Sequence, residues 1–138
     1  MRAVALDIGE VRCGVAATDA SGTLASPVCV LPAREVLEGA PSWRRVLEDH
    51  EPEVLVCGLP RTLAGEEGPQ AERIREQACR VAAACGLPLE FVDERLSSAE
   101  AKRVLRGRGL GEREMRGKVD MVAASLFLET WLEARDEV

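Results

Sequence analysis

The amino-acid sequence predicts an α/β fold in which helices pack on a mixed five-stranded sheet. Two observations support this prediction. Three short apolar segments with tight connections open the chain, and further apolar segments then alternate with segments of helical period. Short connections favour antiparallel strands, whereas strand–helix alternation favours parallel ones. The length of 138 residues predicts one domain over 1–138, at roughly 100–200 residues per domain.

The first three strands follow from apolar runs and the turns that end them. Residues 3–8 are a nearly continuous apolar run, as expected of a buried central strand. A second strand over 13–18 ends at the turn cluster Asp19-Ala20-Ser21-Gly22, and a third lies near 27–31.

The remaining elements alternate in type. We predict helices over 42–50, over 69–85, from the capping box Ser97-x-x-Glu100 to about Arg106, and from about Gly117 to Arg135, with strands at 54–57 and 89–92. The long Gly/Pro-rich loop from Gly58 to Gln70 is predicted to be either a mobile surface loop or a flap over a ligand cleft, because loops of this length are often functional.

Composition and cysteine usage predict a reduced globular protein. Hydrophobic residues make up 46% of the chain and charged residues 30%, which argues against disordered and collagen-like chains. Because no apolar run approaches the ~18 residues of a membrane helix and no signal-peptide pattern opens the chain, we expect a cytoplasmic protein that does not contact membranes. The five cysteines form no C-x-x-C pair and are predicted to be small reduced core residues. With His50 as the only histidine, a zinc site has few ligands to draw on.

Charge is unevenly distributed along the chain. The net charge of −6 argues against nonspecific binding of polyanions. Residues 101–118, however, carry seven basic and two acidic side chains. This stretch is either a solvated helix face or a contact for a phosphate backbone.

Four carboxylates stand where apolar residues are expected. Asp7 and the pair Asp93-Glu94 lie at the C-terminal ends of predicted strands, which is where open α/β sheets bind ligands. Asp120 lies in an otherwise apolar segment, where an unpaired charge would cost several kcal/mol. Structural alternatives remain: a helix-dipole role for Asp120, a turn cap at Gly9 for Asp7, and a salt bridge to Arg95 or Lys102 for Glu94.

Taken together, these carboxylates suggest a metal centre. Oxygen-only ligand sets without histidine or cysteine suit hard cations such as Mg²⁺ and Mn²⁺. Two such ions can clamp the attacking and leaving oxygens of a phosphoryl displacement, a chemistry that requires no nucleophilic side chain.

An ordered set of motifs resembles a known family. The motifs are Ala5-Leu6-Asp7-Ile8-Gly9, Arg12-Cys13-Gly14-Val15-Ala16, Val56-Cys57-Gly58-Leu59-Pro60, Gly65 to Gln70, Asp93 to Ala101, and Lys118-Val119-Asp120-Met121-Val122-Ala123-Ala124. Over about residues 1–133 the chain is similar to the YqgF/RuvX family, an RNase H-like group of pre-16S rRNA nucleases and Holliday junction resolvases. Ser97-Ser98 and Arg61-Thr62-Leu63-Ala64 depart from the usual family pattern.

The resemblance implies an RNase H-like fold and a metal-dependent nuclease. It implies that the acidic site consists of Asp7, Asp93, Glu94 and Asp120, with Asp7, Glu94 and Asp120 as metal ligands and Asp93 in support. It also implies that Arg12, Arg61, Arg95 and Lys118 face the substrate phosphates, and that Mg²⁺ or Mn²⁺ is the cofactor, with two ions expected. The expected reaction is processing of the 5′ end of pre-16S rRNA, with ribosomal precursor particles as partners and a monomer or homodimer as the assembly.

Three alternatives stay open at this point. The substrate could be branched DNA cut by a Holliday junction resolvase rather than structured RNA. The chain could instead be a non-catalytic nucleic-acid or ribosome-assembly binding protein whose acids are structural. An ATP-dependent phosphotransferase also opens with an Asp-x-Gly turn, but that architecture needs two such domains, and this chain has the length of one. Because the chain contains only four aromatic residues, recognition by backbone and shape is favoured over base stacking.

Overall fold

A computed structural model describes residues 1–60, 68–93, 97–115 and 117–136. The strands are β1 (Ala3–Ile8), β2 (Arg12–Thr18), β3 (Ala25–Pro32), β4 (Val54–Leu59) and β5 (Leu89–Asp93). They form one sheet in the order β3-β2-β1-β4-β5, in which β1–β2 and β2–β3 are antiparallel and β1–β4 and β4–β5 are parallel. The predicted mixed five-stranded sheet is confirmed.

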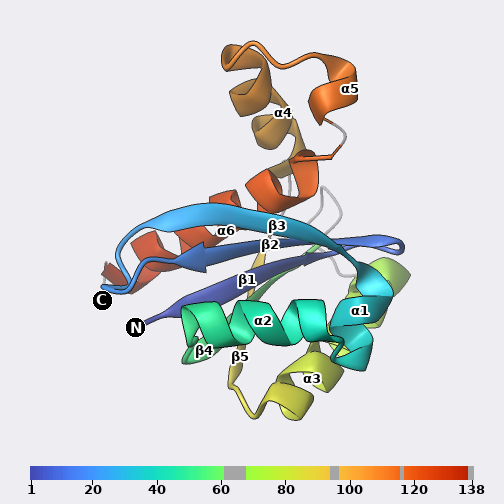
Figure 1. Ribbon diagram of the computed structural model, residues 1–138, viewed down its shortest axis with the longest axis vertical. Helices are drawn as coiled ribbons and strands as arrows, with labels where there is room; N and C mark the ends of the chain where they lie inside the picture. The colour runs from blue at the N-terminus through green and yellow to red at the C-terminus, as the bar shows by residue number, and fades with distance from the viewer. Residues whose placement is uncertain (61–67, 94–96, 116, 137–138) are drawn as a thin grey trace.

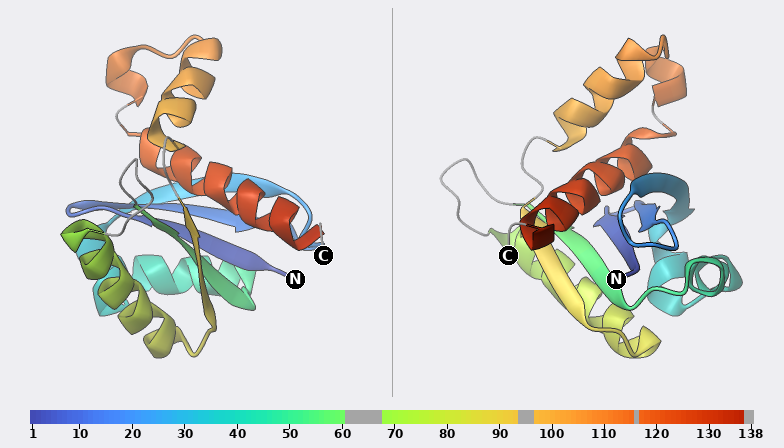
Figure 2. Two further views of the ribbon diagram at one scale, coloured as in Figure 1. Left: turned by 180° about the vertical axis from the view of Figure 1, so that it is seen from behind. Right: turned by 90° about the vertical axis from the view of Figure 1, so that its left-hand side faces the viewer.

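Six helices are described around this sheet: α1 (Ala33–Glu38), α2 (Pro41–His50), α3 (Pro69–Cys85), α4 (Ser97–Gly107), α5 (Glu112–Met115) and α6 (Val119–Asp136). Helices α1, α2 and α3 cover one face of the sheet and α6 lies on the other (Figure 1). Helices α4 and α5 come before α6 in the chain. They lie beyond its N-terminal end and project away from the sheet (Figure 2). In the described ranges, no helix is long and apolar enough to cross a membrane.

The longer helices match their sequence signals, whereas two short ones were not predicted. Helix α3 begins with Pro69 in its first turn and ends at Gly86, whose φ of 69° suits glycine and whose N–H caps the last carbonyls. Helices α1 and α5 span six and four residues. That is too short for a 3.6-residue period to stand out from its surroundings.

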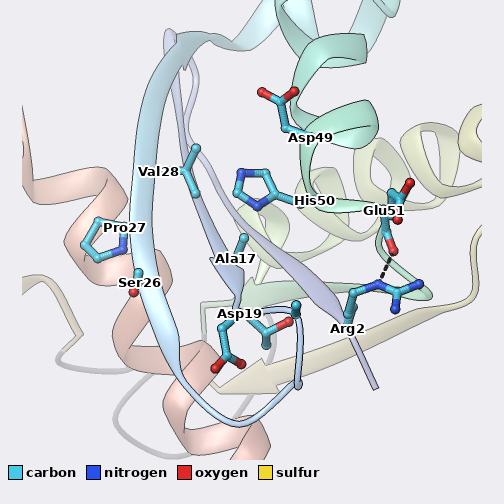
Figure 3. A pocket seen from close by; sticks show the side chains of 11 residues that line it. Arg2, Ala17, Asp19, Ser26, Pro27, Val28, Asp49, His50 and Glu51 are labelled. Carbon is cyan, nitrogen blue, oxygen red and sulfur yellow. Dashed lines mark hydrogen bonds between the residues drawn. The ribbon is translucent and has the colours of Figure 1, made fainter.

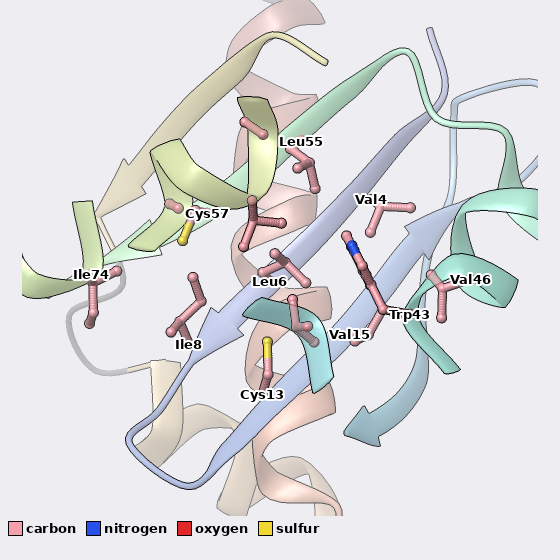
Figure 4. Close-up of a cluster of buried hydrophobic side chains, with 14 of the residues drawn as sticks. Val4, Leu6, Ile8, Cys13, Val15, Trp43, Val46, Leu55, Cys57 and Ile74 are labelled. Carbon is pink, nitrogen blue, oxygen red and sulfur yellow. The ribbon is translucent and has the colours of Figure 1, made fainter. Parts of the chain in front are cut away.

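The central strands β1, β2 and β4 are buried on both faces, because helices cover both sides of the sheet and the side chains of each strand alternate between them. In β1, Val4, Leu6 and Ile8 join the cluster under α1–α3, which also holds Trp43 and Ile74 (Figure 4). On the opposite face, the cluster beneath α6 combines small sheet residues with large helix residues: Ala3, Ala5, Ala16, Val54, Val56, Ala124, Phe127, Leu128 and Trp131. Small side chains on this face allow α6 to pack closely on the central strands.

A third apolar cluster fastens α4 and α5 to the start of α6. It consists of Ala101, Leu105, Met115, Val122 and Ala123, all of which are buried. The projecting helices therefore have a core of their own and are tied to the first two turns of α6.

The cysteine prediction is confirmed in part. None of the five cysteines forms a disulfide, and Cys13 and Cys57 are buried in the core. Cys79, however, is exposed, so its assignment to the core was wrong. It lies on α3 next to the buried Ala78, on the side of the helix that faces solvent.

Candidate functional site

Asp7 is placed by the alternation of the central strand. It is the fifth residue of β1 and half-buried, and its strand partner in β2 is Gly14. Since Ala3 and Ala5 face α6, the same parity directs Asp7 toward the α6 side of the sheet. A carboxylate thus ends a row of alanines on the face covered by this helix.

Asp120 reaches the same place from the C-terminal helix. It lies in the first turn of α6, and its backbone packs directly on Gly14, where an added Cβ would overlap the Asp120 carbonyl group. Because Gly14 is the strand partner of Asp7, the fold brings Asp7 and Asp120 together across one glycine. A negative side chain at this position is also favoured by the helix dipole.

Arg12 completes the described part of this site. It begins β2 after a turn in which the Gly9 N–H donates to the Arg12 carbonyl at 2.9 Å. Its Nε lies 3.3 Å from Oδ2 of Asp120, with side-chain exposures of 57% and 30%. Such an exposed pair contributes at most about 1 kcal/mol to stability. Arg12 therefore leaves much of its guanidinium open to solvent beside the carboxylates.

The pKa of the neighbouring Cys13 thiol is influenced by the carboxylates of both Asp7 and Asp120. Burial raises the pKa of Cys13, and the negative charges of Asp7, Cys29 and Asp120 raise it further. Cys13 lies in the cluster on the opposite face of the sheet from α6. The electrostatic influence of Asp7 and Asp120 on one thiol agrees with their common position near Gly14.

Asp93 falls on a different face. It ends β5, where Leu89 and Phe91 belong to the α1–α3 cluster and Val92 packs beneath α6. Because side chains alternate between the two faces of a strand, Asp93 is directed to the same face as Phe91, away from the face that carries Asp7. The structure does not bring Asp93 to the α6 side with Asp7 and Asp120.

Five predicted functional features need separate mention. Arg61, Glu94 and Arg95 lie outside the described residues, as does most of the Gly58–Gln70 loop, so the roles assigned to them stay predictions. Lys118 is exposed just before α6, and its carbonyl accepts the N–H of Val122. Its side chain is thus open to solvent two residues from Asp120.

The donor chemistry at this site fits a hydrated hard cation. Within the described ranges there is no group of three or more His, Cys, Asp or Glu residues arranged to hold a metal. Mg²⁺ is commonly held by only one or two protein carboxylates, with waters and substrate phosphates completing its shell. Asp7 and Asp120 supply such a pair, partly open to solvent.

Gly14 is the site residue whose role sequence reasoning missed. It was identified within a family motif, without a structural function. An isolated glycine inside a strand often marks the close approach of another backbone. That signal was present in the sequence, and the partner backbone is that of Asp120.

Two hollows in the surface lie away from Asp7 and Asp120. One of about 360 Å³ is lined by Arg2, Thr18, Asp19 and His50 among others (Figure 3). The other, about 470 Å³, lies between α2 and β3. The first opens at the Thr18 end of β2, whereas Arg12 and Gly14 are at its beginning. Neither hollow includes a residue predicted to be functional.

Comparison with known sequences gives a consistent result over nearly the whole chain. A family profile described as "RuvX: Holliday junction resolvase" matches residues 1–134. A protein of Anaeromyxobacter sp. (strain K), named "Putative pre-16S rRNA nuclease", is 43% identical over 135 residues, 98% of this chain and 98% of that protein. A protein of the same name from Thermosynechococcus vestitus is 37% identical over 132 residues, 96% of this chain and 87% of that protein.

Comparison with solved structures concerns the fold. T. thermophilus RuvC in complex with a Holliday junction substrate matches with a TM-score of 0.57 at 19% identity, covering 100% of this chain and 97% of that one. The fowlpox virus Holliday junction resolvase matches with a TM-score of 0.55 at 15% identity, covering 97% and 99%. At these identities the likeness shows a shared fold, and the predicted RNase H-like architecture is confirmed.

Proposed function

The chain belongs to the RuvX family, and from that premise we propose that it is a metal-dependent nuclease that hydrolyses phosphodiester bonds in structured nucleic acid. The observation that carries the proposal is the meeting of Asp7 and Asp120 against Gly14. Two aspartates from opposite ends of the chain lie around Gly14 on the α6 side of the sheet, beside an arginine that suits phosphate.

Asp7, Asp120 and the predicted third ligand Glu94 would hold Mg²⁺ or Mn²⁺, with two ions expected. When bound, the metal stabilises the negative charge that develops on the phosphoryl group. Asp93 is proposed to act in support of Glu94, which is compatible with its direction away from Asp7.

The basic residues have a positioning role in this proposal. Arg12 and Lys118 present exposed cations near Asp120, one from β2 and one from the residue just before α6. Contacts of this kind fix a phosphate backbone in register without reading its sequence. Arg61 and Arg95 are proposed to contribute in the same way.

The proposed substrate is the precursor of 16S rRNA, cut near its 5′ end. The names of the two relatives described above favour this substrate, and ribosomal precursor particles would then be the partners. Such a reaction takes place in the cytoplasm, where the five free thiols would stay reduced. The description of the matching family favours a second candidate, resolution of branched DNA, for which a homodimer would suit the two strands to be cut.

The deciding experiment uses the purified protein, Mn²⁺ or Mg²⁺, and labelled pre-16S rRNA fragments, hairpin RNA, single-stranded RNA, duplex DNA and four-way junction DNA. We expect cleavage of structured RNA that requires metal and is lost in Asp7→Asn. Asp49→Asn, a matched change of an exposed aspartate on α2, should cleave as wild type. Both variants should unfold at a similar temperature.

The remaining outcomes separate the alternatives. Cleavage of the junction alone would select the resolvase. Binding of RNA without cleavage by any preparation, together with no effect of Mn²⁺ on thermal stability, would refute the nuclease and leave a binding protein. Full activity in Asp7→Asn would refute the assigned site.

A further inference from the structure

The positive charge of this acidic protein is concentrated on one projecting element. The whole chain has 18 basic and 24 acidic residues, yet residues 101–118 hold seven basic and two acidic ones, leaving 11 and 22 for the rest. We call α4 and α5, residues 97–115, the basic arm. It extends beyond the N-terminal end of α6 and away from the sheet (Figures 1 and 2).

The cations of the basic arm point to solvent because its apolar residues point inward. Ala101 and Leu105 are buried against α6, whereas Lys102, Arg103 and Arg106 are exposed on the same helix. Arg108 and Arg113 continue the exposed series after α4. Lys102 and Arg106 are one helical turn apart, about 6 Å along the axis. From 101 to 111 the sequence contains no acidic residue.

The position of this face is coupled to the candidate site. Leu105 and Met115 of the arm pack with Val122 and Ala123, which lie two and three residues after Asp120 in α6. The Lys118 N–H also donates to the Met115 carbonyl at 2.9 Å. The same helix start thus carries Asp120 and anchors the arm, so that a ligand held by the arm has a set direction relative to the carboxylates.

We propose that the basic arm is a docking surface for the phosphate backbone of nucleic acid that extends beyond the cleavage site. This inference rests on the proposed nuclease function and adds the residues that hold the substrate at a distance from the chemistry: Lys102, Arg103 and Arg108. The arm contains no aromatic residue, so it provides ionic contacts without base stacking. Binding through the arm is therefore independent of base sequence and strongly dependent on salt.

Charge favours nucleic acid over an acidic protein as the occupant. Apart from residues 101–118 the chain is strongly acidic and repels any polyanion, so the field of the molecule directs a polyanion to the arm and the adjoining site. Four of the five exposed cations of the arm are arginines, whose forked donors match phosphate oxygens. The arm's attachment beside Asp120 is expected for a substrate contact, whereas a protein-docking surface has no need of that position.

The test neutralises the arm in the full chain. The triple variant Lys102→Gln/Arg103→Gln/Arg108→Gln is compared with Arg34→Gln/Arg44→Gln/Arg45→Gln, which removes three exposed cations from α1 and α2. Binding of hairpin RNA and of four-way junction DNA is measured over a series of salt concentrations, without divalent metal, in an Asp7→Asn background. Thermal unfolding checks that each variant is folded.

We expect the arm variant to bind at least one of the two probes roughly tenfold or more weakly at low salt, and the slope of log K against log salt to fall by about 2 to 3, as for three lost phosphate contacts. The control should keep the wild-type slope. With active protein, KM for a long substrate should rise in the arm variant, while kcat should stay close to wild type.

Because the binding assay does not need cleavage, the two proposals can fail separately. If the wild type does not cleave but the salt dependence of binding is reduced in the arm variant, the nuclease proposal is refuted and the docking role of the arm is retained. If the wild type cleaves in a metal-dependent way but the salt dependence of binding is unchanged in the arm variant, the docking role of the arm is overturned. An arm that docks an acidic protein instead would also leave the slope unchanged.

Discussion

The backbone carbonyl of Asp120 occupies the space that a side chain on Gly14 would need. Gly14 sits opposite Asp7 in the β1–β2 pair, so this contact sets how closely the helix start approaches the central strand. The separation of the two carboxylates thus depends on a residue without a side chain. A backbone contact of this kind has little room to adjust, because neither partner is the flexible end of a side chain.

Gly14→Ala is expected to push the start of α6 away from β2. Overpacking of this kind costs roughly 1–3 kcal/mol, so urea unfolding should show a reduced free energy of unfolding. The loss of cleavage should exceed what this destabilisation explains, because Asp120 moves relative to Asp7. Gly107→Ala is the matched control for the urea unfolding, since a methyl group there meets nothing within 4 Å. Normal cleavage by a folded Gly14→Ala protein would contradict this account.

Arg12→Ala is expected to change metal and nucleic-acid affinity in opposite directions. The guanidinium lies 3.3 Å from the Asp120 carboxylate and opposes a second cation there. At such an exposed position its removal should tighten Mn²⁺ binding only a few-fold, corresponding to less than about 1 kcal/mol. Binding of RNA should weaken. Calorimetric titration with Mn²⁺ and a fluorescence binding assay measure the two effects, and a parallel change in both would exclude the assigned role.

Glu90 is expected to stabilise the C-terminal half of α6. Its Oε1 accepts the indole N–H of buried Trp131 at 3.1 Å, and Arg135 lies over the same ring. Glu90→Leu leaves the indole N–H without an acceptor, which should cost about 1 kcal/mol. Glu90→Gln keeps an acceptor oxygen and should unfold nearly as wild type. Equal urea midpoints for the two variants would show that the hydrogen bond does not contribute.

Cys13 is expected to make the protein less stable in alkali. Burial and the nearby carboxylates raise its pKa in the folded state above the ordinary value of 9.0. Below pH 9 both states keep the proton, and the stabilisation is fully present. Above pH 9 the unfolded thiol ionises while the folded one does not, so the free energy of unfolding falls by up to about 1.4 kcal/mol per pH unit.

The measurement is urea unfolding between pH 7 and pH 10.5 for the wild type and Cys13→Ala. The variant should lose stability less steeply above pH 9, whatever its stability at pH 7. Identical slopes for the two proteins would contradict the assignment to Cys13.

Local patterns accounted for most of the secondary structure. The predicted strand over residues 3–8 and the predicted helix over 69–85 match β1 and α3 in extent. The strand is a nearly continuous apolar run, and the helix is long enough to show its period and is followed by Gly86 as a clear stop signal. Helix α1 was missed because six residues after Pro32 show no period. The exposure of Cys79 was missed because apolar neighbours in the sequence do not determine whether a helical residue faces the core or the solvent.

By itself, the sequence determined the α/β class, the order of the strands and of the four longer helices, the family resemblance and the excess of basic residues between 101 and 118. These properties depend on local period and composition, which can be read along the chain. Only the tertiary structure decided that Asp7 and Asp120 meet across Gly14, that Asp93 takes the other face, and that the basic residues stand on a projecting arm. The meeting of Asp7 and Asp120 depends on the pairing of β1 with β2 and on the docking of α6, which places Asp120 against Gly14, a residue more than a hundred positions earlier in the chain. Contacts of this kind leave no periodic signal in the sequence.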